Sequence, residues 1–393
     1  MSHPLISHNP DLKRLQDEGI EIEIQGGYLV VHHIPYLRSA TEVRYGILVS
    51  TLALAGERVQ KPDTHVAYFI GEVPCDKSGN PIHAIINASA RTQLAEKIVI
   101  DHTLSAKPQN GYADYFEKIT TYINIISAPA KSIDPSVTEK TFRVLNFDDT
   151  DRVFNYPDTN SARSQIDVVT AKLKTQKVAI IGLGGTGSYI LDLVAKTPVA
   201  EIHLYDGDVF VQHNAFRAPG APSSEQLEEV KKKVDYFKAI YSNMHLKIVP
   251  HGSHITASLF GELDSMTMVF MCFDEGETKK GLANYLEEKG IRFIDVGMGL
   301  QKVEDTLIGI VRVTSSTERK RDHVLGKERI PFTDGGDNEY SNNIQIADLN
   351  ALNAALAVIK WKKLCGFYQD LERENYSVYS INVSQLLNED NDP

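Results

Sequence analysis

A cluster of glycines follows a short apolar run near the middle of the chain. The run "KVAII" covers residues 177–181, and Gly182, Gly184, Gly185 and Gly187 come next in "GLGGTG". Glycines between a strand and a helix permit a tight turn and let backbone N–H groups approach phosphate oxygens. The sequence therefore predicts a phosphate-binding loop, although the glycines fit NAD as well as ATP.

Polar residues beyond this loop favour one of the two nucleotides. Asp206 ends the apolar run "EIHLYD", where a carboxylate accepts hydrogen bonds from ribose hydroxyls of either cofactor. Asp208, Asn214 and Arg217 follow within "YDGDVFVQHNAFR". A dehydrogenase has no obvious use for the last two, whereas with a triphosphate Asn can contact an oxygen and Arg can neutralise the departing pyrophosphate. We therefore expect ATP.

Two further features complete this set. The stretch "EEVKKKVDYFKAIYSNM" places three lysines at the start of an expected helix. Asp274, in "MVFMCFDEGETKK", comes just after a buried-type strand, where a carboxylate can hold Mg²⁺.

The ordered set of GxGGxG, Asp-x-Asp-x-Val, Asn-x-x-Arg, a helix-leading lysine and a strand-ending aspartate resembles the ThiF/MoeB and ubiquitin-activating adenylyltransferase family, over about residues 160–370. The resemblance implies that the C-terminal carboxylate of a ubiquitin-like protein attacks the α-phosphate of ATP, giving acyl-AMP and pyrophosphate. It also implies Mg²⁺ and a homodimer. Residues 1–145 resemble a domain fused to some bacterial ThiF-type proteins beside ubiquitin-like and conjugating-enzyme genes. That resemblance implies a conjugating-enzyme partner in a bacterial conjugation pathway, plausible in antiviral defence.

The family's roles can be transferred residue by residue. Asp206 resembles the ribose ligand, beside Asp208, and Asp274 resembles the aspartate that positions magnesium. Asn214 and Arg217 resemble the phosphate-contacting pair.

The catalytic lysine of the family has three candidates here. When helical positions are numbered from Lys233, the apolar residues of the expected helix fall on one buried face. When they are numbered from Lys231, the apolar residues no longer share a face. We therefore select Lys233 rather than Lys231 or Lys232. Family members also bring a second arginine, often from the partner subunit, and Arg163 in "TNSARSQI" is the candidate.

The expected crossover loop, residues 315–343, departs from the family pattern because it contains no cysteine. Three explanations remain open. The enzyme only adenylates; or it forms an oxyester on a hydroxyl, with Thr333 the first candidate and Ser341 and Ser315 as alternatives; or Cys75 of the first domain supplies a thiol. A hydroxyl nucleophile needs an activating base, and the sequence identifies none.

The surrounding elements indicate an α/β fold. From about residue 160, short apolar runs alternate with helical stretches, which predicts a doubly wound, mostly parallel sheet, as in Rossmann-like domains. Residues 1–150 read as an N-terminal α+β domain for partner docking, with a hairpin turning at Gly26-Gly27, and residues 151–393 as the adenylation domain.

Composition restricts the class of protein. A net charge of −11 disfavours non-specific nucleic-acid binding, and no apolar run is long enough for a membrane span. Three scattered cysteines favour a reducing cytoplasm, and Cys272 and Cys365 read as packing residues. The histidines match no standard metal-ligand spacing. The cationic residues of the crossover loop, from Arg319 to Arg329, are either a solvated face or a surface for an acidic partner.

Two other functions compete with adenylation. An NAD(P)-dependent oxidoreductase would use the same glycine loop, but the ordered Asn214, Arg217 and Asp274 argue against it. A catalytically silent adenylation fold would serve as a scaffold for a partner. Pyrophosphate exchange separates the scaffold from the enzyme.

Overall fold

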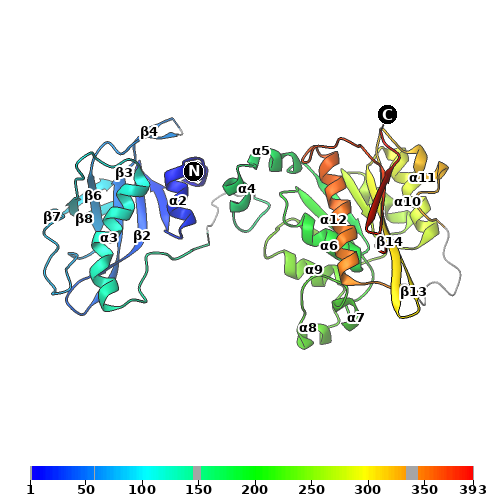
Figure 1. The fold of residues 1–393 in the computed structure, drawn as a ribbon, viewed down its shortest axis with the longest axis horizontal. Coiled ribbons are helices and arrows are strands. Elements are labelled where there is room, and N and C mark those ends of the chain that lie inside the picture. Colours follow the sequence, from blue (N-terminus) through cyan, green and yellow to red (C-terminus); the bar gives the residue numbers. More distant parts are fainter. Residues whose placement is uncertain (1, 57, 145–151, 333–343, 393) are drawn as a thin grey trace. The chain divides into compact units, whose positions relative to one another are not determined.

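The computed structural model describes residues 2–56, 58–144, 152–332 and 344–392. The chain divides into two compact units, residues 1–145 and 146–393 (Figure 1). In each unit, helices pack against a β-sheet.

The first unit is built on a six-stranded sheet in the order β1-β2-β3-β6-β8-β7, in which all neighbours are antiparallel. Gly26 and Gly27 adopt positive φ angles and turn β1 into β2, as the sequence predicts. Helix α3 packs across β2 and buries Tyr115, Tyr122 and Ile126. The elements are α1 (Ser2–His8), α2 (Pro10–Asp17), β1 (Ile22–Gln25), β2 (Tyr28–Leu37), β3 (Val43–Thr51), β4 (Leu54–Ala55), β5 (Arg58–Val59), β6 (Val66–Ile70), β7 (Ile86–Ala95), β8 (Ile98–Ser105) and α3 (Tyr115–Ile133).

The second unit contains an eight-stranded sheet in the order β11-β10-β9-β12-β13-β14-β15-β16. The first five strands of this order are parallel, and the last three add antiparallel pairs. The strands are β9 (Lys177–Ile181), β10 (Glu201–Tyr205), β11 (Ile248–His251), β12 (Met268–Met271), β13 (Phe293–Val303), β14 (Thr306–Ser316), β15 (Tyr376–Ser380) and β16 (Gln385–Glu389).

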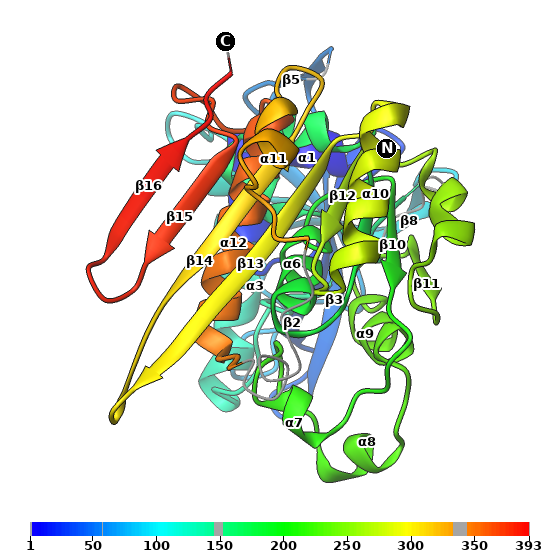
Figure 2. The same ribbon diagram turned by 90° about the vertical axis from the view of Figure 1, so that its right-hand side faces the viewer.

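Helices cover both faces of this sheet. Apolar residues of α6, α9 and α12 pack on one face in a core with β9 and β10, and α10 packs on the other (Figure 2). The helices are α4 (Thr159–Ser164), α5 (Asp167–Thr170), η1 (Ala171–Leu173), α6 (Gly185–Val194), α7 (Gln212–Ala215), α8 (Ser224–Glu228), α9 (Lys233–Tyr241), η2 (Ala257–Leu263), α10 (Gly276–Lys289), α11 (Asp322–Gly326) and α12 (Ala347–Leu364). This confirms the predicted doubly wound α/β class.

The strand order fixes where a ligand can bind. From β9 the chain moves outward to β10 and β11, and then returns to the other side of β9 to form β12 and β13. In open α/β sheets, ligands bind outside the carboxyl ends of the strands at such a reversal. Here the reversal lies between β9 and β12, which end just before the glycine loop and Asp274.

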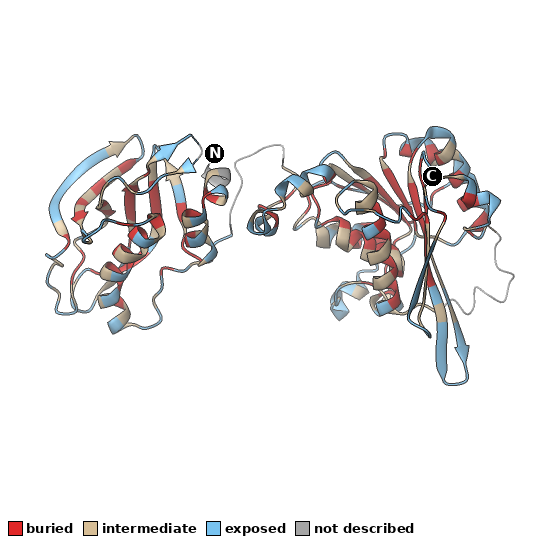
Figure 3. Cartoon of the chain, turned by 45° about the horizontal axis from the view of Figure 1, so that its top comes forward, coloured by how far each residue is buried: buried red, intermediate tan, exposed pale blue. Residues whose placement is uncertain are grey.

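A hairpin that the sequence analysis did not foresee completes the sheet. The sequence indicates one last strand at residues 376–384, but β15 turns into β16, which pairs with it from Tyr376–Glu389 to Ser380–Gln385. The long hairpin of β13 and β14 is buried where it joins the sheet and exposed at its far end (Figure 3). Within the described residues, no helix is long and apolar enough to cross a membrane.

Candidate functional site

The glycine loop is shaped by close contacts that leave no room for side chains at two positions. Gly182 has a φ of +88°, and a Cβ there would lie 2.5 Å from the carbonyl oxygen of Cys272. A Cβ on Gly187 would lie 1.9 Å from the carbonyl oxygen of Gly182. Glycine is required at both positions because the loop folds back tightly between the ends of β9 and β12.

Gly184 differs because its open side faces a pocket. It is the N-cap of α6, and a Cβ there would meet no atom within 4 Å. No side chain caps the helix at this end, so its first N–H groups are available to an anion. Residues of the loop, Asp274 and Gly297 line a pocket of about 50 Å³. The structure thus places Asp274, exposed after β12, beside the phosphate-binding loop.

Asp206, which directly follows β10, links the glycine loop to Asp208. Its Oδ2 accepts a hydrogen bond from the Leu183 N–H at 2.7 Å, and its Oδ1 accepts from the Asp208 N–H at 2.9 Å. The carboxylate is buried, and backbone amides compensate its charge. A ribose would therefore meet a carboxylate that the fold has already oriented.

Lys233 is the buried member of the lysine run. Its Nζ lies 2.6 Å from Asp208 Oδ2 and 3.4 Å from Asp206 Oδ2. Lys231 and Lys232 are exposed: the first pairs with Glu229 and the second donates to the Gly252 carbonyl. The Lys233 ammonium is the main cause that holds the pKa of Asp208 below its ordinary value, and His254 and Arg217 add to the effect.

Asn214 and Arg217 lie on and after the short helix α7. Asn214 is buried, and its Oδ1 accepts a hydrogen bond from the Val211 N–H at 3.0 Å, which fixes the orientation of the side-chain amide. Arg217 has a buried Nε with no hydrogen-bond partner in the described part of the chain. A buried, unsatisfied guanidinium N–H costs free energy unless an acceptor arrives, which suits an anion ligand.

Two asparagines of α12 belong to this site, and the sequence analysis missed them. A Cβ on Gly185 would lie 2.0 Å from the Asn350 side chain, which accepts from the Thr186 hydroxyl at 3.0 Å and donates to the Arg217 carbonyl at 3.3 Å. Asn353 donates to the Gly297 carbonyl at 3.0 Å and lines the same pocket. The spacing of two asparagines on one face of an apolar helix is a pattern that could have revealed them.

A buried charge cluster lies beside this pocket and was also missed. Asp295 is fully buried, with Lys279 Nζ 2.9 Å from one oxygen and Arg312 Nη2 2.6 Å from the other. Arg312 also donates to the Arg329 carbonyl at 2.7 Å. The cluster therefore connects α10, the sheet and the segment that enters the crossover loop.

The three cysteines are poor nucleophiles. Burial raises the pKa of the Cys75 thiol, which contacts the carbonyl oxygens of Arg38 and Val73. Burial raises the pKa of Cys365 to about 11, and burial together with Asp295 raises the pKa of Cys272. A thiol acts as a nucleophile only when ionised, so these environments disfavour the proposed thiol route through Cys75.

The crossover segment departs from two expectations. Ser315 is buried and donates to Asn375 Oδ1 at 2.8 Å, so it is not an accessible acceptor for an acyl group. Lys320, Lys327 and Arg329 pair with aspartates of the same unit rather than forming an open cationic surface. Thr333 and Ser341 lie outside the described residues.

Arg163 lies apart from the glycine loop within this unit. It is exposed on α4, whose neighbouring residues line a cavity together with Lys196 and Thr197 beyond the far end of α6. A role for Arg163 in a partner's site stays a prediction. No cluster of three or more His, Cys, Asp or Glu suited to a metal ion occurs among the described residues.

Two protein-family models match the chain, over ranges that overlap at residues 115–159. Residues 115–302 match the ThiF family, a range that includes the glycine loop, Asp206, Arg217, Lys233 and Asp274. The chain contains a ThiF family domain. Residues 10–159 match a domain of unknown function, DUF6791. The ThiF match begins within α3 of the first unit and ends before α12, so Asn350 and Asn353 lie outside it.

Solved structures similar to this chain include PaaA, with 17% sequence identity and a TM-score of 0.44 over 57% of this chain and 75% of that one. The microcin C7 biosynthetic enzyme MccB in complex with N-formylated MccA has 18% identity and a TM-score of 0.46, over 60% and 71%. E. coli MccB with ATP has 16% identity and a TM-score of 0.44, over 60% and 72%. No curated protein matches the chain.

Proposed function

We propose that the chain activates a carboxylate by adenylation with ATP. The observation that carries the proposal is the convergence of unlike groups at the carboxyl ends of β9, β10 and β12. An uncapped helix N-terminus and the oriented carboxylate of Asp206 lie there, and Arg217, whose Nε is unsatisfied, is close enough to help lower the pKa of Asp208. A nicotinamide cofactor would need the first two, but a triphosphate needs all three.

The reaction follows from the chemistry of these groups. A substrate carboxylate is already ionised at neutral pH, so no general base is required. Its oxygen attacks the α-phosphorus, and the bond from that phosphorus to the bridging oxygen breaks as pyrophosphate leaves. Arg217 and Lys233 stabilise the negative charge that develops on the phosphates, and the loop holds the phosphate chain in place.

Asp274 fits the role of the magnesium-binding residue. It is an exposed carboxylate that lines the same pocket as the loop, and carboxylate oxygens are the ligands that Mg²⁺ prefers. When bound, Mg²⁺ would neutralise charge on the phosphates.

The substrate we propose is the C-terminal tail of a ubiquitin-like protein, in a bacterial conjugation pathway that also uses a conjugating enzyme. Its support is the order of motifs along the chain. The enzyme then passes the acyl group onward, either directly from acyl-AMP or through an oxyester on Thr333. The raised pKa of the Cys75 thiol disfavours a thioester, and the burial of Ser315 disfavours an oxyester at that hydroxyl.

Calorimetry with Mg-ATP and with NADH tests the nucleotide. We expect the wild-type protein to bind Mg-ATP. In a separate assay with a ubiquitin-like protein present, Arg217→Ala and Asp274→Ala should lower the rate of pyrophosphate exchange by about 100-fold or more while the protein remains folded. Lys233→Met should act similarly, and Lys231→Met, at an exposed lysine of the same run, is the matched control. Binding of NADH alone, or unchanged exchange in the Arg217 and Asp274 variants, would refute the proposal.

Mass spectrometry after incubation with ATP and the ubiquitin-like protein distinguishes the two later routes. An adduct that resists thiols but is cleaved by mild base indicates a hydroxyl ester. No adduct, with exchange intact, indicates adenylation alone.

A further inference from the structure

A larger cavity lies at the end of the second unit opposite the glycine loop. It has a volume of about 750 Å³, within the range of small-molecule sites. Lys196 and Thr197, which follow α6, contribute to its lining, whereas the glycine loop begins the same helix. Because α6 has ten residues, about 15 Å of helix separates the two sites.

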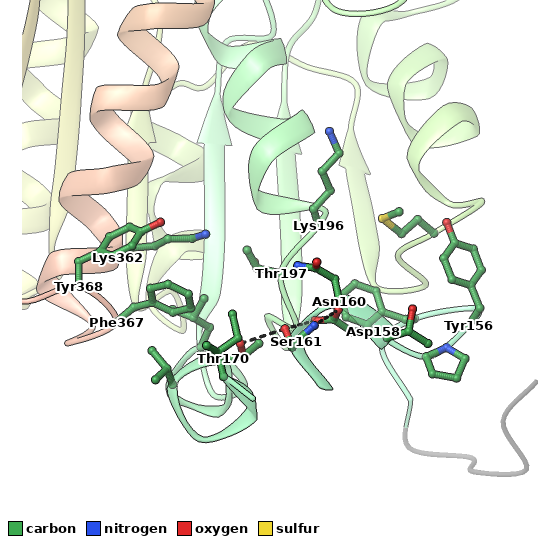
Figure 4. Close-up of a pocket in the computed structure, with 17 residues that line it drawn as sticks. Tyr156, Asp158, Asn160, Ser161, Thr170, Lys196, Thr197, Lys362, Phe367 and Tyr368 are labelled. Carbon is green, nitrogen blue, oxygen red and sulfur yellow. Dashed lines mark hydrogen bonds between the residues drawn. The ribbon is translucent and has the colours of Figure 1, made fainter. Parts of the chain in front are cut away.

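We call this space the basal cavity. Hydrogen bonds join the segment that forms its wall to the rest of the unit at both edges. On one side, the Asn155 N–H donates to the Met244 carbonyl at 2.9 Å. On the other, Lys172 Nζ donates to the Gly366 carbonyl at 2.6 Å. Helices α4 and α5 lie between these two anchors along the chain, and residues of both contribute to the lining, which Figure 4 shows as sticks.

Apolar and aromatic side chains make up most of the cavity wall. Phe154, which precedes α4 in the chain, lines the cavity and packs edge-on against the His245 ring. Ile166, Val169 and Leu173 come from the region of α5 and η1. Such a wall favours the apolar body of a ligand, because burial of apolar area stabilises a complex by about 25 cal/mol per Å².

One cation in this wall lacks a carboxylate partner. Gly366 has a φ of +70° and turns the chain after α12, which brings Phe367 and Tyr368 back against Lys362. Lys362 Nζ lies 4.7 Å from the centre of the Phe367 ring and 5.9 Å from that of Tyr368. It makes no ion pair with any described residue, and burial lowers its pKa. Figure 4 shows its ammonium directed toward the middle of the cavity.

The neighbouring charged side chains have hydrogen-bond or ion-pair partners of their own. Lys363 pairs with Glu374 at 2.9 Å, and Lys196 pairs with Asp192 at 2.7 Å. Asp158 lines the cavity, but its two oxygens accept hydrogen bonds from the N–H and hydroxyl of Ser161. Of the two lysines that line the cavity, Lys362 is therefore the one without a carboxylate partner in the described parts of the chain.

We propose that the basal cavity binds a small amphipathic anion, with an apolar body against the cavity wall and a carboxylate on Lys362. The volume of the cavity fits a small organic molecule. The half-buried ammonium is poorly solvated by water, so an ion pair with a ligand carboxylate would stabilise its charge. The proposal does not depend on the adenylation function, since it concerns the opposite end of the unit.

Calorimetry with octanoate tests this site in the full-length protein. We expect saturable binding at one site, and weaker binding of 1-octanol and of octylammonium, because only the anion matches Lys362. Lys362→Met keeps an unbranched apolar side chain and should weaken octanoate binding by about tenfold. Lys363→Met, one residue away and directed to Glu374, should leave it unchanged.

A second variant tests the cavity itself. Val169→Phe adds volume inside the wall and should reduce octanoate binding while Lys362 remains. Circular dichroism and thermal unfolding establish that each variant is folded. The proposal is overturned if octanoate does not bind at millimolar concentration, if 1-octanol binds as tightly, or if Lys362→Met and Lys363→Met bind octanoate equally.

Discussion

The two ends of α6 meet very different surroundings. At its N-terminus, the glycine loop, Asp274 and Asn353 line a small polar pocket of about 50 Å³. Beyond its C-terminus, the basal cavity is some 750 Å³, largely apolar, and carries one unpaired cation. The N-terminal end presents oriented backbone N–H groups and charged side chains to a ligand, whereas the C-terminal end presents a larger space.

The proposed nucleotide site is thus the smaller of the two pockets, and the two pockets suit ligands of different chemistry. A nucleotide held by N–H groups at a helix terminus needs little enclosed space, because hydrogen bonds to phosphate provide the binding. A ligand with few polar atoms depends on buried apolar area instead. Substitutions at the two ends should therefore reduce stability or ligand binding for different physical reasons.

The largest effect is expected at Asp295, near the glycine-loop end. Asp295→Asn would leave Lys279 and Arg312 buried without a carboxylate, which should lower the free energy of unfolding by about 4 kcal/mol. Urea unfolding measures this loss. Asp264→Asn, at an exposed aspartate 3.9 Å from Lys289, is the control and should change stability by less than about 0.5 kcal/mol. Equal stability of the two variants would mean that the buried cluster is not a stabilising unit.

Two alanine substitutions in the glycine loop should distinguish an effect on stability from an effect on ATP binding. Gly187→Ala forces a Cβ against the Gly182 carbonyl and should cost about 3 kcal/mol of stability. Gly184→Ala meets open space and should unfold like the wild type, yet it should weaken ATP binding because its methyl group enters the pocket. Thermal unfolding and an ATP titration give both quantities. Wild-type ATP affinity in Gly184→Ala would contradict the placement of the phosphates at this loop.

A smaller effect is expected at the opposite end, where it depends on pH. His245 Nε2 donates to the Val199 carbonyl, and its Nδ1 accepts from the Lys247 N–H. Burial lowers the pKa of this histidine to about 4, so the folded state resists protonation. The unfolded state takes up the proton first as pH falls through about 6.5, and stability should drop by about 3 kcal/mol at most between pH 6.5 and 4.

Urea unfolding at pH 7 and at pH 4.5 measures this dependence. His245→Gln cannot take up a proton and should show a smaller loss over the same interval. If the wild type and the variant lose equal stability, the pH dependence comes from other groups.

Local patterns predicted most of the second unit. The alternation of apolar runs and helices anticipated the parallel strands, because such strands are short and buried on both faces. Lys233 could be distinguished from Lys231 and Lys232 by the apolar stripe of α9, since burial follows helical periodicity. Its ion pairs with Asp206 and Asp208 were not foreseen, although the three residues lie close in sequence.

Other contacts lay beyond the reach of such patterns. The partners of Asp295 come from α10 and β14, and only the sheet register places Arg312 opposite Gly297. The basal cavity depends on how α4 and α5 bridge toward α12, which no periodicity describes. Likewise, β16 is mostly exposed and lacks the apolar alternation that marks a strand.

The hydrogen bond from Thr186 to Asn350 spans 164 positions of the chain. At about 5–20 residues per second, a ribosome adds that length in roughly 8–30 seconds. Throughout this interval the growing polypeptide contains the glycine loop but lacks the amide that braces it. Nascent molecules should therefore be unable to retain nucleotide until α12 emerges, and a fragment ending at residue 302 should remain in that immature condition permanently.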